Sequence, residues 1–135
     1  PVMWIGRLLA KLMPRAGMLA LDSGGVSRDP AVVAAYEADP LVNHGKVTAG
    51  LGIALFDAMA RVMTAADSIT LPMLIMHGGA DTLAAPIGSE TFAARVGAAD
   101  LTLTILPGLY HEIFNEPEGE DIIGRYADWI EARLS

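Results

Sequence analysis

Two stretches decide the fold of this chain: PMLIMHGG (72–79) and LTLTILPG (101–108). Each is a short apolar or β-branched run that ends at glycine or proline, which is typical of a strand followed by a turn. We therefore expect strands at about 72–77 and 101–106. Residues 86–96 between them begin with a proline, which favours a helix. A strand, a helix and a second strand with short connections indicate a parallel sheet, so the predicted fold class is α/β.

Further helices are expected on both sides of this unit. Residues 118–134 have an amphipathic pattern, and residues 2–13 are apolar almost all round. Asp29 is a good N-cap for a short helix that starts at the following proline. A longer helix is expected from about 46 to 66, whereas residues 17–28 have no clear period and predict a loop. The apolar positions of the longer helix recur every four residues: Val47, Leu51, Leu55, Met59 and Met63.

The composition fits a folded domain. Hydrophobic residues make up 53% of the 135 residues and charged residues only 19%, which excludes a disordered tail. The net charge is −7 and no run of Lys or Arg occurs. No nucleic-acid partner is expected, because phosphate binding needs clustered positive charge. The chain has no cysteine, which excludes disulfides and thiolate chemistry.

Signals for metals, membranes and export are weak. His44, His77 and His111 lie far apart and lack metal-ligand spacing, so no metal or other cofactor is predicted. No uninterrupted run of about 18 apolar residues predicts a membrane span. No signal-peptide pattern follows the apolar N-terminal segment. A cytoplasmic location is the default expectation.

Two ionisable residues follow the predicted strands. Asp81 lies four residues beyond the first strand and His111 five residues beyond the second. Functional residues of open parallel sheets gather at the carboxyl ends of strands, so the carboxylate and the imidazole could meet there. Asp81 would then accept the Nδ1 proton of His111 and hold its tautomer. Taken singly, the aspartate fits a turn or cap and the histidine fits a solvated loop.

The motifs HGGAD (77–81) and PGLYHE (107–112) resemble the aspartate and histidine motifs of α/β-hydrolases, and among these the monoacylglycerol lipase and lysophospholipase group. The upstream segments SRDP (27–30), YEADPLV (36–42) and HGK (44–46) resemble the cap region of bacterial members, and FNEP (114–117) extends the match. The resemblance implies a mostly parallel, eight-stranded sheet with a helical cap after the sixth strand. Residues 1–66 would be the cap segment and residues 67–135 the C-terminal part of the core.

The same resemblance implies a serine hydrolase of monoacylglycerol or lysophospholipid-like esters, without cofactor or metal. Asp81 and His111 would be its catalytic residues: Asp81 would orient and stabilise His111, and His111 would act as general base and then as general acid. The Gly-x-Ser-x-Gly nucleophile motif is absent. In this fold the serine precedes the aspartate in the sequence. Because no serine before Asp81 fits the motif, we expect the nucleophile to lie upstream of Pro1 and this fragment alone to be inactive. The start at Pro1 instead of Met agrees with an upstream part.

The expected partner is a small lipid ester. The methionine-rich first half suits an acyl chain, but ordinary packing of helices on a core accounts for the same methionines. Arg7 and Lys11 form a basic stripe on the apolar helix 2–13, which allows a transient contact with a membrane surface, and packing within the core or cap is the alternative. Two alternatives stay open. One is a general carboxylesterase or peptidase of the same fold, and the other is a non-catalytic binding module that has lost the nucleophile.

Overall fold

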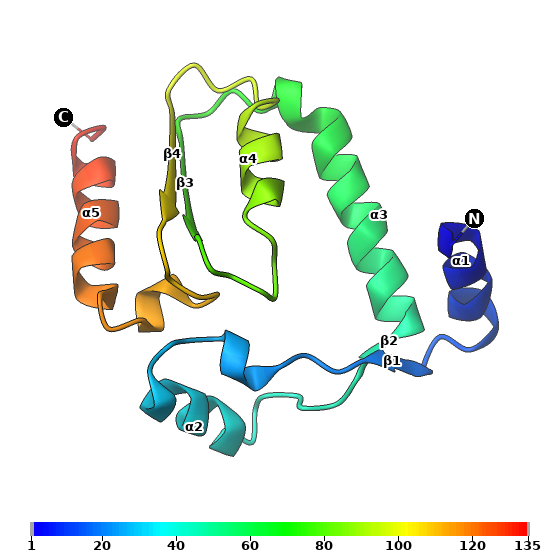
Figure 1. The fold of residues 1–135 in the computed structure, drawn as a ribbon. Coiled ribbons are helices and arrows are strands. Elements are labelled where there is room, and N and C mark those ends of the chain that lie inside the picture. Colours follow the sequence, from blue (N-terminus) through cyan, green and yellow to red (C-terminus); the bar gives the residue numbers. More distant parts are fainter. Residues whose placement is uncertain (1, 135) are drawn as a thin grey trace.

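The structure is a computed structural model that describes residues 2–134. The expectation that the catalytic serine lies upstream of Pro1 concerns a part outside these residues. Two parallel strands, β3 (Met73–Gly78) and β4 (Leu101–Leu106), pair in register from Met73 opposite Leu101 to Gly78 opposite Leu106. Helix α4 (Ile87–Ala93) connects them (Figure 1). The predicted parallel α/β unit is confirmed, with strand bounds within one residue of those expected.

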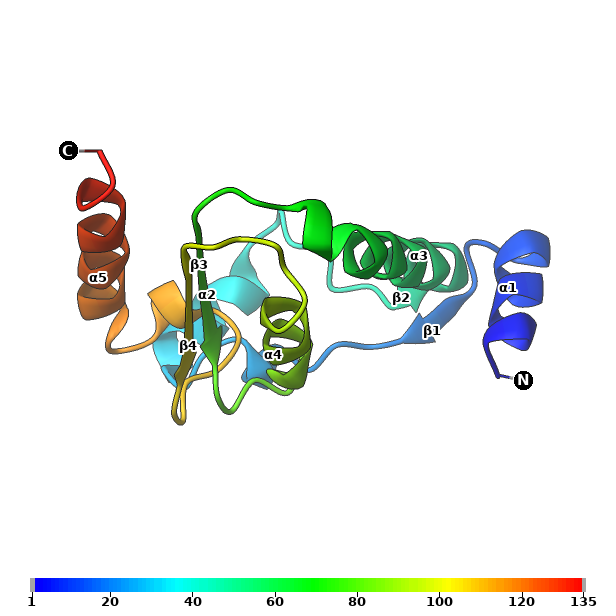
Figure 2. The ribbon, with the colours of Figure 1, turned by 90° about the horizontal axis from the view of Figure 1, so that it is seen from above.

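Helices cover both faces of this two-stranded sheet. In Figures 1 and 2, α4 lies on one side of β3 and β4, and α5 (Gly119–Glu131) lies on the other. The indole Nε1 of Trp129 on α5 donates to Oγ1 of Thr102 on β4, at 2.9 Å. The buried core of this part lies beneath α5. It consists of Leu106, Leu109 and Ile122, with Met76 and Ile113 packed against them.

The first half of the chain is mainly helical, as expected. Helix α2 (Pro30–Ala38) begins where the sequence predicts, because Oδ1 of Asp29 accepts the N–H of Ala31 at 2.8 Å. The remaining elements are α1 (Val2–Leu12), β1 (Gly17–Leu19), β2 (Val47–Thr48), α3 (Ala49–Ala65) and the short 3-10 turns η1 (Ser23–Gly25), η2 (Ala66–Ser68) and η3 (Ile113–Asn115).

Two expectations for this half are wrong. The predicted loop 17–28 contains β1, which pairs antiparallel with β2, and the turn η1. The long helix begins at Ala49 instead of residue 46, because Thr48 is its N-cap and accepts the N–H of Leu51 at 3.3 Å. The residues before this cap extend into β2, although the four-residue apolar repeat already begins at Val47.

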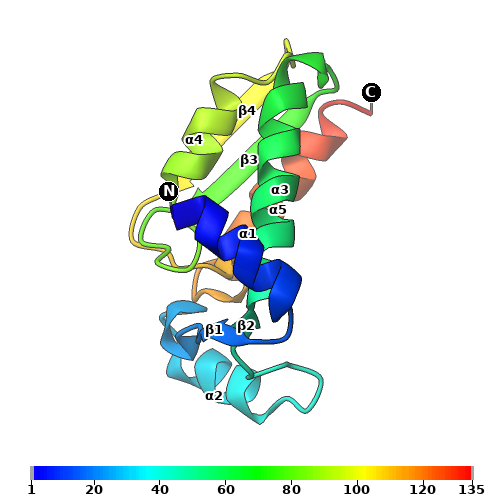
Figure 3. The same ribbon diagram turned by 90° about the vertical axis from the view of Figure 1, so that its right-hand side faces the viewer.

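Helices α1 and α3 pack together and leave much apolar surface exposed. Figure 3 shows α1 crossing α3, and Arg7 of α1 forms a two-pronged ion pair with Asp57 of α3. Trp4 and Leu12 on α1 and Phe56 on α3 are more than half exposed. The continuous helical stretch Ala49–Ser68 is long and apolar enough to cross a membrane by length and composition, although charged residues interrupt it.

Candidate active site

A tight turn after β3 holds the carboxylate of Asp81. The N–H of Asp81 donates to the carbonyl of Gly78 at 3.2 Å. Oδ1 of Asp81 accepts the N–H groups of Leu83 (2.8 Å) and Ala84 (2.9 Å). Only 2% of the Asp81 side chain is exposed. The turn therefore fixes one carboxylate oxygen and leaves Oδ2 for another partner.

A second turn after β4 brings His111 toward Asp81. Gly108 adopts a φ of +78°, a conformation that favours glycine, and the carbonyl of Leu109 accepts the N–H of Ala80 at 2.9 Å. The two turns approach so closely at Gly78 that an added Cβ would lie 2.0 Å from the carbonyl oxygen of Tyr110. Glycine at position 78 is therefore what lets the two turns meet.

The structure places the two predicted residues in direct contact. Nδ1 of His111 lies 2.8 Å from Oδ2 of Asp81. A carboxylate only accepts, so Nδ1 carries the proton and Nε2 is free to accept one. The His111 side chain is 44% exposed, and within residues 2–134 its Nε2 has no hydrogen-bond partner. This arrangement suits a general base whose tautomer is fixed by a buried carboxylate.

The surroundings of Asp81 stabilise its charged form. Burial, the largest single influence, raises the pKa of Asp81 by penalising the charge. Hydrogen bonds from the N–H of Ala84, from His111 and from the N–H of Leu83 outweigh it, and the net pKa is lowered. Asp81 is therefore a carboxylate when it faces His111.

A second imidazole, that of His77, also contacts Asp81. Nε2 of His77 lies 3.1 Å from Oδ2 of Asp81 and 2.8 Å from the carbonyl oxygen of Ala84. Because the carbonyl only accepts, Nε2 carries the proton, and Nδ1 accepts the hydroxyl of Ser89 at 2.7 Å. No role for His77 is predicted from the sequence. Its position is the one available signal, since His77 ends the predicted strand four residues before Asp81.

A segment from the first half of the chain completes the site. The N–H of His111 donates to the carbonyl of Gly25 at 3.3 Å, and the N–H of Glu112 donates to that of Val26 at 2.8 Å. These bonds hold the backbone of the turn after β4 that carries His111, the histidine turn, against residues 25–26. Sequence reasoning missed this pairing, because neither segment has a strand-like pattern.

Other candidate groups lie elsewhere or are already engaged. His44 packs edge-on against Tyr36, with ring centroids 5.6 Å apart. Among residues 2–134, no group of three or more His, Cys, Asp or Glu residues could hold a metal ion. Each serine hydroxyl in the same range bonds to a group other than His111. The partners are Glu37 for Ser23, the Asn115 carbonyl for Ser27, the Ala65 carbonyl for Ser68 and His77 for Ser89.

Comparisons with known proteins give consistent matches. A family model described as serine aminopeptidase, S33, matches residues 1–118. The chain is 42% identical over 130 residues to the monoacylglycerol lipase of Mycolicibacterium smegmatis, a match that covers 96% of this chain and 46% of that protein.

Solved structures agree with the sequence matches. The monoacylglycerol lipase of Paleococcus ferrophilus superposes with a TM-score of 0.85 at 32% identity, covering 95% of this chain and 50% of that one. A soluble variant of the monoglyceride lipase of Saccharomyces cerevisiae, in complex with a substrate analog, gives a TM-score of 0.77 at 26% identity, covering 98% and 47%. The chain thus spans about half the length of these relatives.

Proposed function

Because this chain belongs to the serine aminopeptidase S33 family of α/β-hydrolases, in the monoacylglycerol lipase group, we propose that it supplies the acid–base pair of a serine esterase. The substrate is the carboxylic ester of a monoacylglycerol or a lysophospholipid-like lipid. The observation that carries this proposal is the 2.8 Å hydrogen bond between Asp81 Oδ2 and His111 Nδ1, which leaves Nε2 free.

In the proposed reaction, His111 moves the protons and Asp81 stabilises its charged form. Nε2 takes the proton of the serine hydroxyl as the oxygen attacks the ester carbonyl, and the carboxylate of Asp81 stabilises the imidazolium that forms. Nε2 then protonates the leaving glycerol oxygen, and an acyl-enzyme remains. Water attacks this ester with His111 again as base, releasing the fatty acid and the serine hydroxyl.

The nucleophile in this proposal is supplied by a part of the protein outside the 135 residues. The sequence contains no Gly-x-Ser-x-Gly segment, which is the usual setting of the serine in this fold. The described serines also bond away from His111, as shown above. The chain by itself is therefore proposed to be inactive.

We also propose that residues 1–66 form the helical cap segment over a core that continues in residues 67–135. The helices of the first half border a groove with an almost wholly apolar lining, which suits an acyl chain. Its side chains include Leu9, Met18, Leu19, Ile53 and Phe56. The exposed apolar residues of α1 and α3 give the cap a surface for transient contact with a membrane, while the protein itself is proposed to be cytoplasmic.

A substrate panel on the full-length protein tests the proposal. Monoacylglycerols of several chain lengths, a simple short-chain ester and an N-terminally free peptide are offered to wild type and to His111→Ala. We expect monoacylglycerols to be cleaved fastest, and only by wild type. Faster cleavage of the peptide or the simple ester would favour the general esterase or peptidase alternative. No cleavage of any substrate, with no labelling by a fluorophosphonate serine probe, would favour a binding module.

A further inference from the structure

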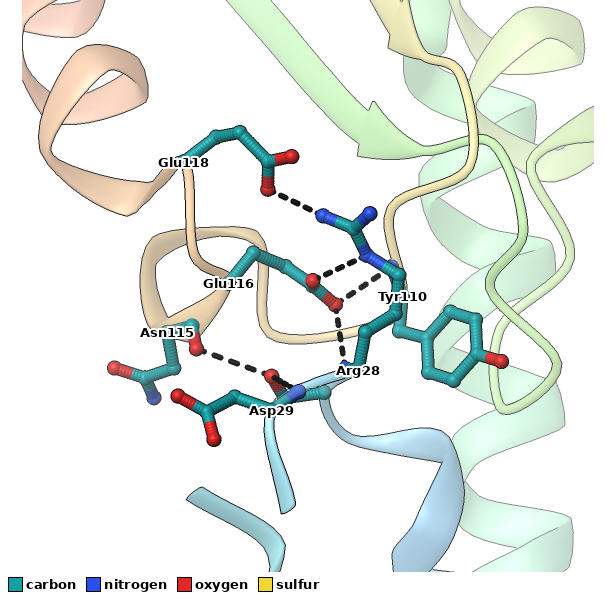
Figure 4. A network of polar contacts seen from close by, with 7 residues as sticks. Arg28, Asp29, Tyr110, Asn115, Glu116 and Glu118 are labelled. Atoms are coloured by element: carbon teal, nitrogen blue, oxygen red, sulfur yellow. Dashed lines mark hydrogen bonds and ion pairs between the residues drawn. The ribbon is translucent and has the colours of Figure 1, made fainter. Parts of the chain in front are cut away.

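Two motifs far apart in the sequence, SRDP (27–30) and FNEP (114–117), meet beside the candidate active site (Figure 4). Oγ of Ser27 donates to the carbonyl oxygen of Asn115 at 3.1 Å and accepts the N–H of Asp29 at 3.0 Å. Both motifs belong to the family resemblance, which implies no particular task for either of them. Their contact joins the start of α2 to the segment that follows His111.

The centre of this contact is the buried carboxylate of Glu116. Its side chain is 0% exposed. Oε1 accepts the N–H of Arg28 at 3.1 Å and the N–H of Tyr110 at 3.0 Å, and Oε2 accepts Nε of Arg28 at 2.6 Å. Nη2 of Arg28 pairs with Glu118. A buried charge persists only where donors replace its water, and these three donors do so for Glu116.

The direction of the Glu116 side chain argues against an ordinary helix cap. Glu116 lies close to the start of α5, but its carboxylate bonds to Tyr110 and Arg28 (Figure 4). The N-cap position of α5 is Glu118, and it makes no side-chain cap bond. The carboxylate of Glu116 therefore serves the histidine turn and the segment before α2.

We propose that Glu116 is a positioning residue that holds His111 in register with Asp81. It fixes the N–H of Tyr110, the residue before His111, and the N–H of Arg28 on one carboxylate oxygen. The N–H groups of His111 and Glu112 are held by the carbonyls of residues 25 and 26. The residue before His111, His111 itself and the residue after it are thus all held, directly or through Glu116, by residues 25–28. This proposal rests on the proposed function, because the gain from such positioning is a correctly placed base.

The test compares Glu116→Gln with Glu118→Gln in the full-length protein. Both changes remove one negative charge beside Arg28, but Glu118 is 50% exposed and contacts only the guanidinium. Glutamine at 116 turns an amide N–H against Nε of Arg28, and its neutral oxygen holds the two backbone N–H groups more weakly than a carboxylate oxygen does. The register of His111 then loosens. We expect kcat and the fluorophosphonate labelling rate to fall on the order of 10- to 100-fold, with KM nearly unchanged. Glu118→Gln should change kcat and the labelling rate by less than about twofold.

A spectroscopic readout separates positioning from simple stabilisation. The Nδ1 proton of His111, shared with Asp81, should give a downfield proton resonance in wild type and in Glu118→Gln. The resonance should shift or broaden in Glu116→Gln, measured well below the unfolding temperature. If Glu116→Gln lowers only the unfolding temperature, and kcat, labelling rate and resonance stay those of wild type, the proposal is overturned.

A milder variant covers the case in which Glu116→Gln does not fold. Glu116→Asp keeps the negative charge beside Arg28 but shortens the side chain by one methylene, so its carboxylate is drawn back from the N–H groups of Tyr110 and Arg28. A fall in labelling rate with a shifted resonance supports the proposal, and wild-type behaviour overturns it. If wild type itself is not labelled, the proposed esterase function fails instead, and the resonance of His111 in the variants still tests the positioning.

Discussion

Replacing Asp81 by asparagine in the full-length protein should abolish most turnover by reversing the tautomer of His111. Oδ1 of Asp81 accepts two backbone N–H groups, from Leu83 and Ala84. An asparagine must place its carbonyl oxygen there, because the opposite orientation would set an amide N–H₂ against two donors. The N–H₂ group therefore faces Nδ1 of His111, which must become the acceptor. The proton moves to Nε2, the atom proposed to act as base.

The expected loss is on the order of 10⁴ in kcat, about 5 kcal/mol of transition-state stabilisation. The assay is steady-state hydrolysis of a monoacylglycerol that wild type cleaves. Asp100→Asn is the matched control, since Asp100 is also a paired aspartate with a lowered pKa, held by Arg133 outside the site. That variant should keep nearly all turnover. A kcat for Asp81→Asn within tenfold of wild type would refute the tautomer reasoning.

Three further outcomes are expected. His111→Ala should lower turnover by several orders of magnitude and remove fluorophosphonate labelling; normal labelling would mean that another base activates the serine. Gly78→Ala should cost about 3 kcal/mol in the free energy of unfolding, because its Cβ would lie 2.0 Å from the Tyr110 carbonyl. Gly88→Ala has no heavy atom within 4 Å of its Cβ and should be neutral or slightly stabilising; equal costs in urea unfolding would contradict the close approach. Because folding lowers the pKa of Asp81, its stabilisation is complete above the ordinary aspartate pKa of about 4 and is lost as pH falls below it. Unfolding free energies between pH 7 and 3 should therefore fall more steeply for wild type than for Asp81→Asn, and equal slopes would count against this.

The sequence predicted elements whose signal is local. Strand β4 is an unbroken run between a polar turn and Pro107, so both of its ends could be read directly. The cap at Asp29 depends on adjacent residues, and it was predicted for the same reason. Strands β1 and β2 were missed because each has only two or three residues and finds its partner about 30 positions away. Thr48 ends the β2 extension and caps α3, which a four-residue apolar repeat does not reveal.

In the candidate site as well, the contact with a local sequence signal was predicted, and the contacts that depend on chain folding were not. Asp81 and His111 could be paired because each follows a predicted strand and parallel strands end at one edge of the sheet. The bond of His77 to Asp81 depends on the bend of the turn, which brings a strand residue back toward the carboxylate. The contact between Arg28 and Glu116 spans 88 positions. Nothing in the local pattern of either residue indicates the other, because chain folding alone brings them together.

The backbone bonds from His111 and Glu112 to the carbonyls of Gly25 and Val26 have a consequence for engineering chimeras. Where two relatives exchange the proposed cap segment, a single crossover at its end near residue 66 takes residues 25–28 from the foreign parent. The histidine turn then rests on a sequence with which it did not evolve. A graft that keeps residues 25–28 from the parent of residues 67–135 leaves these contacts within one parent. Graft libraries built in this way should inherit an intact pair of Asp81 and His111, while the helices that border the apolar groove vary.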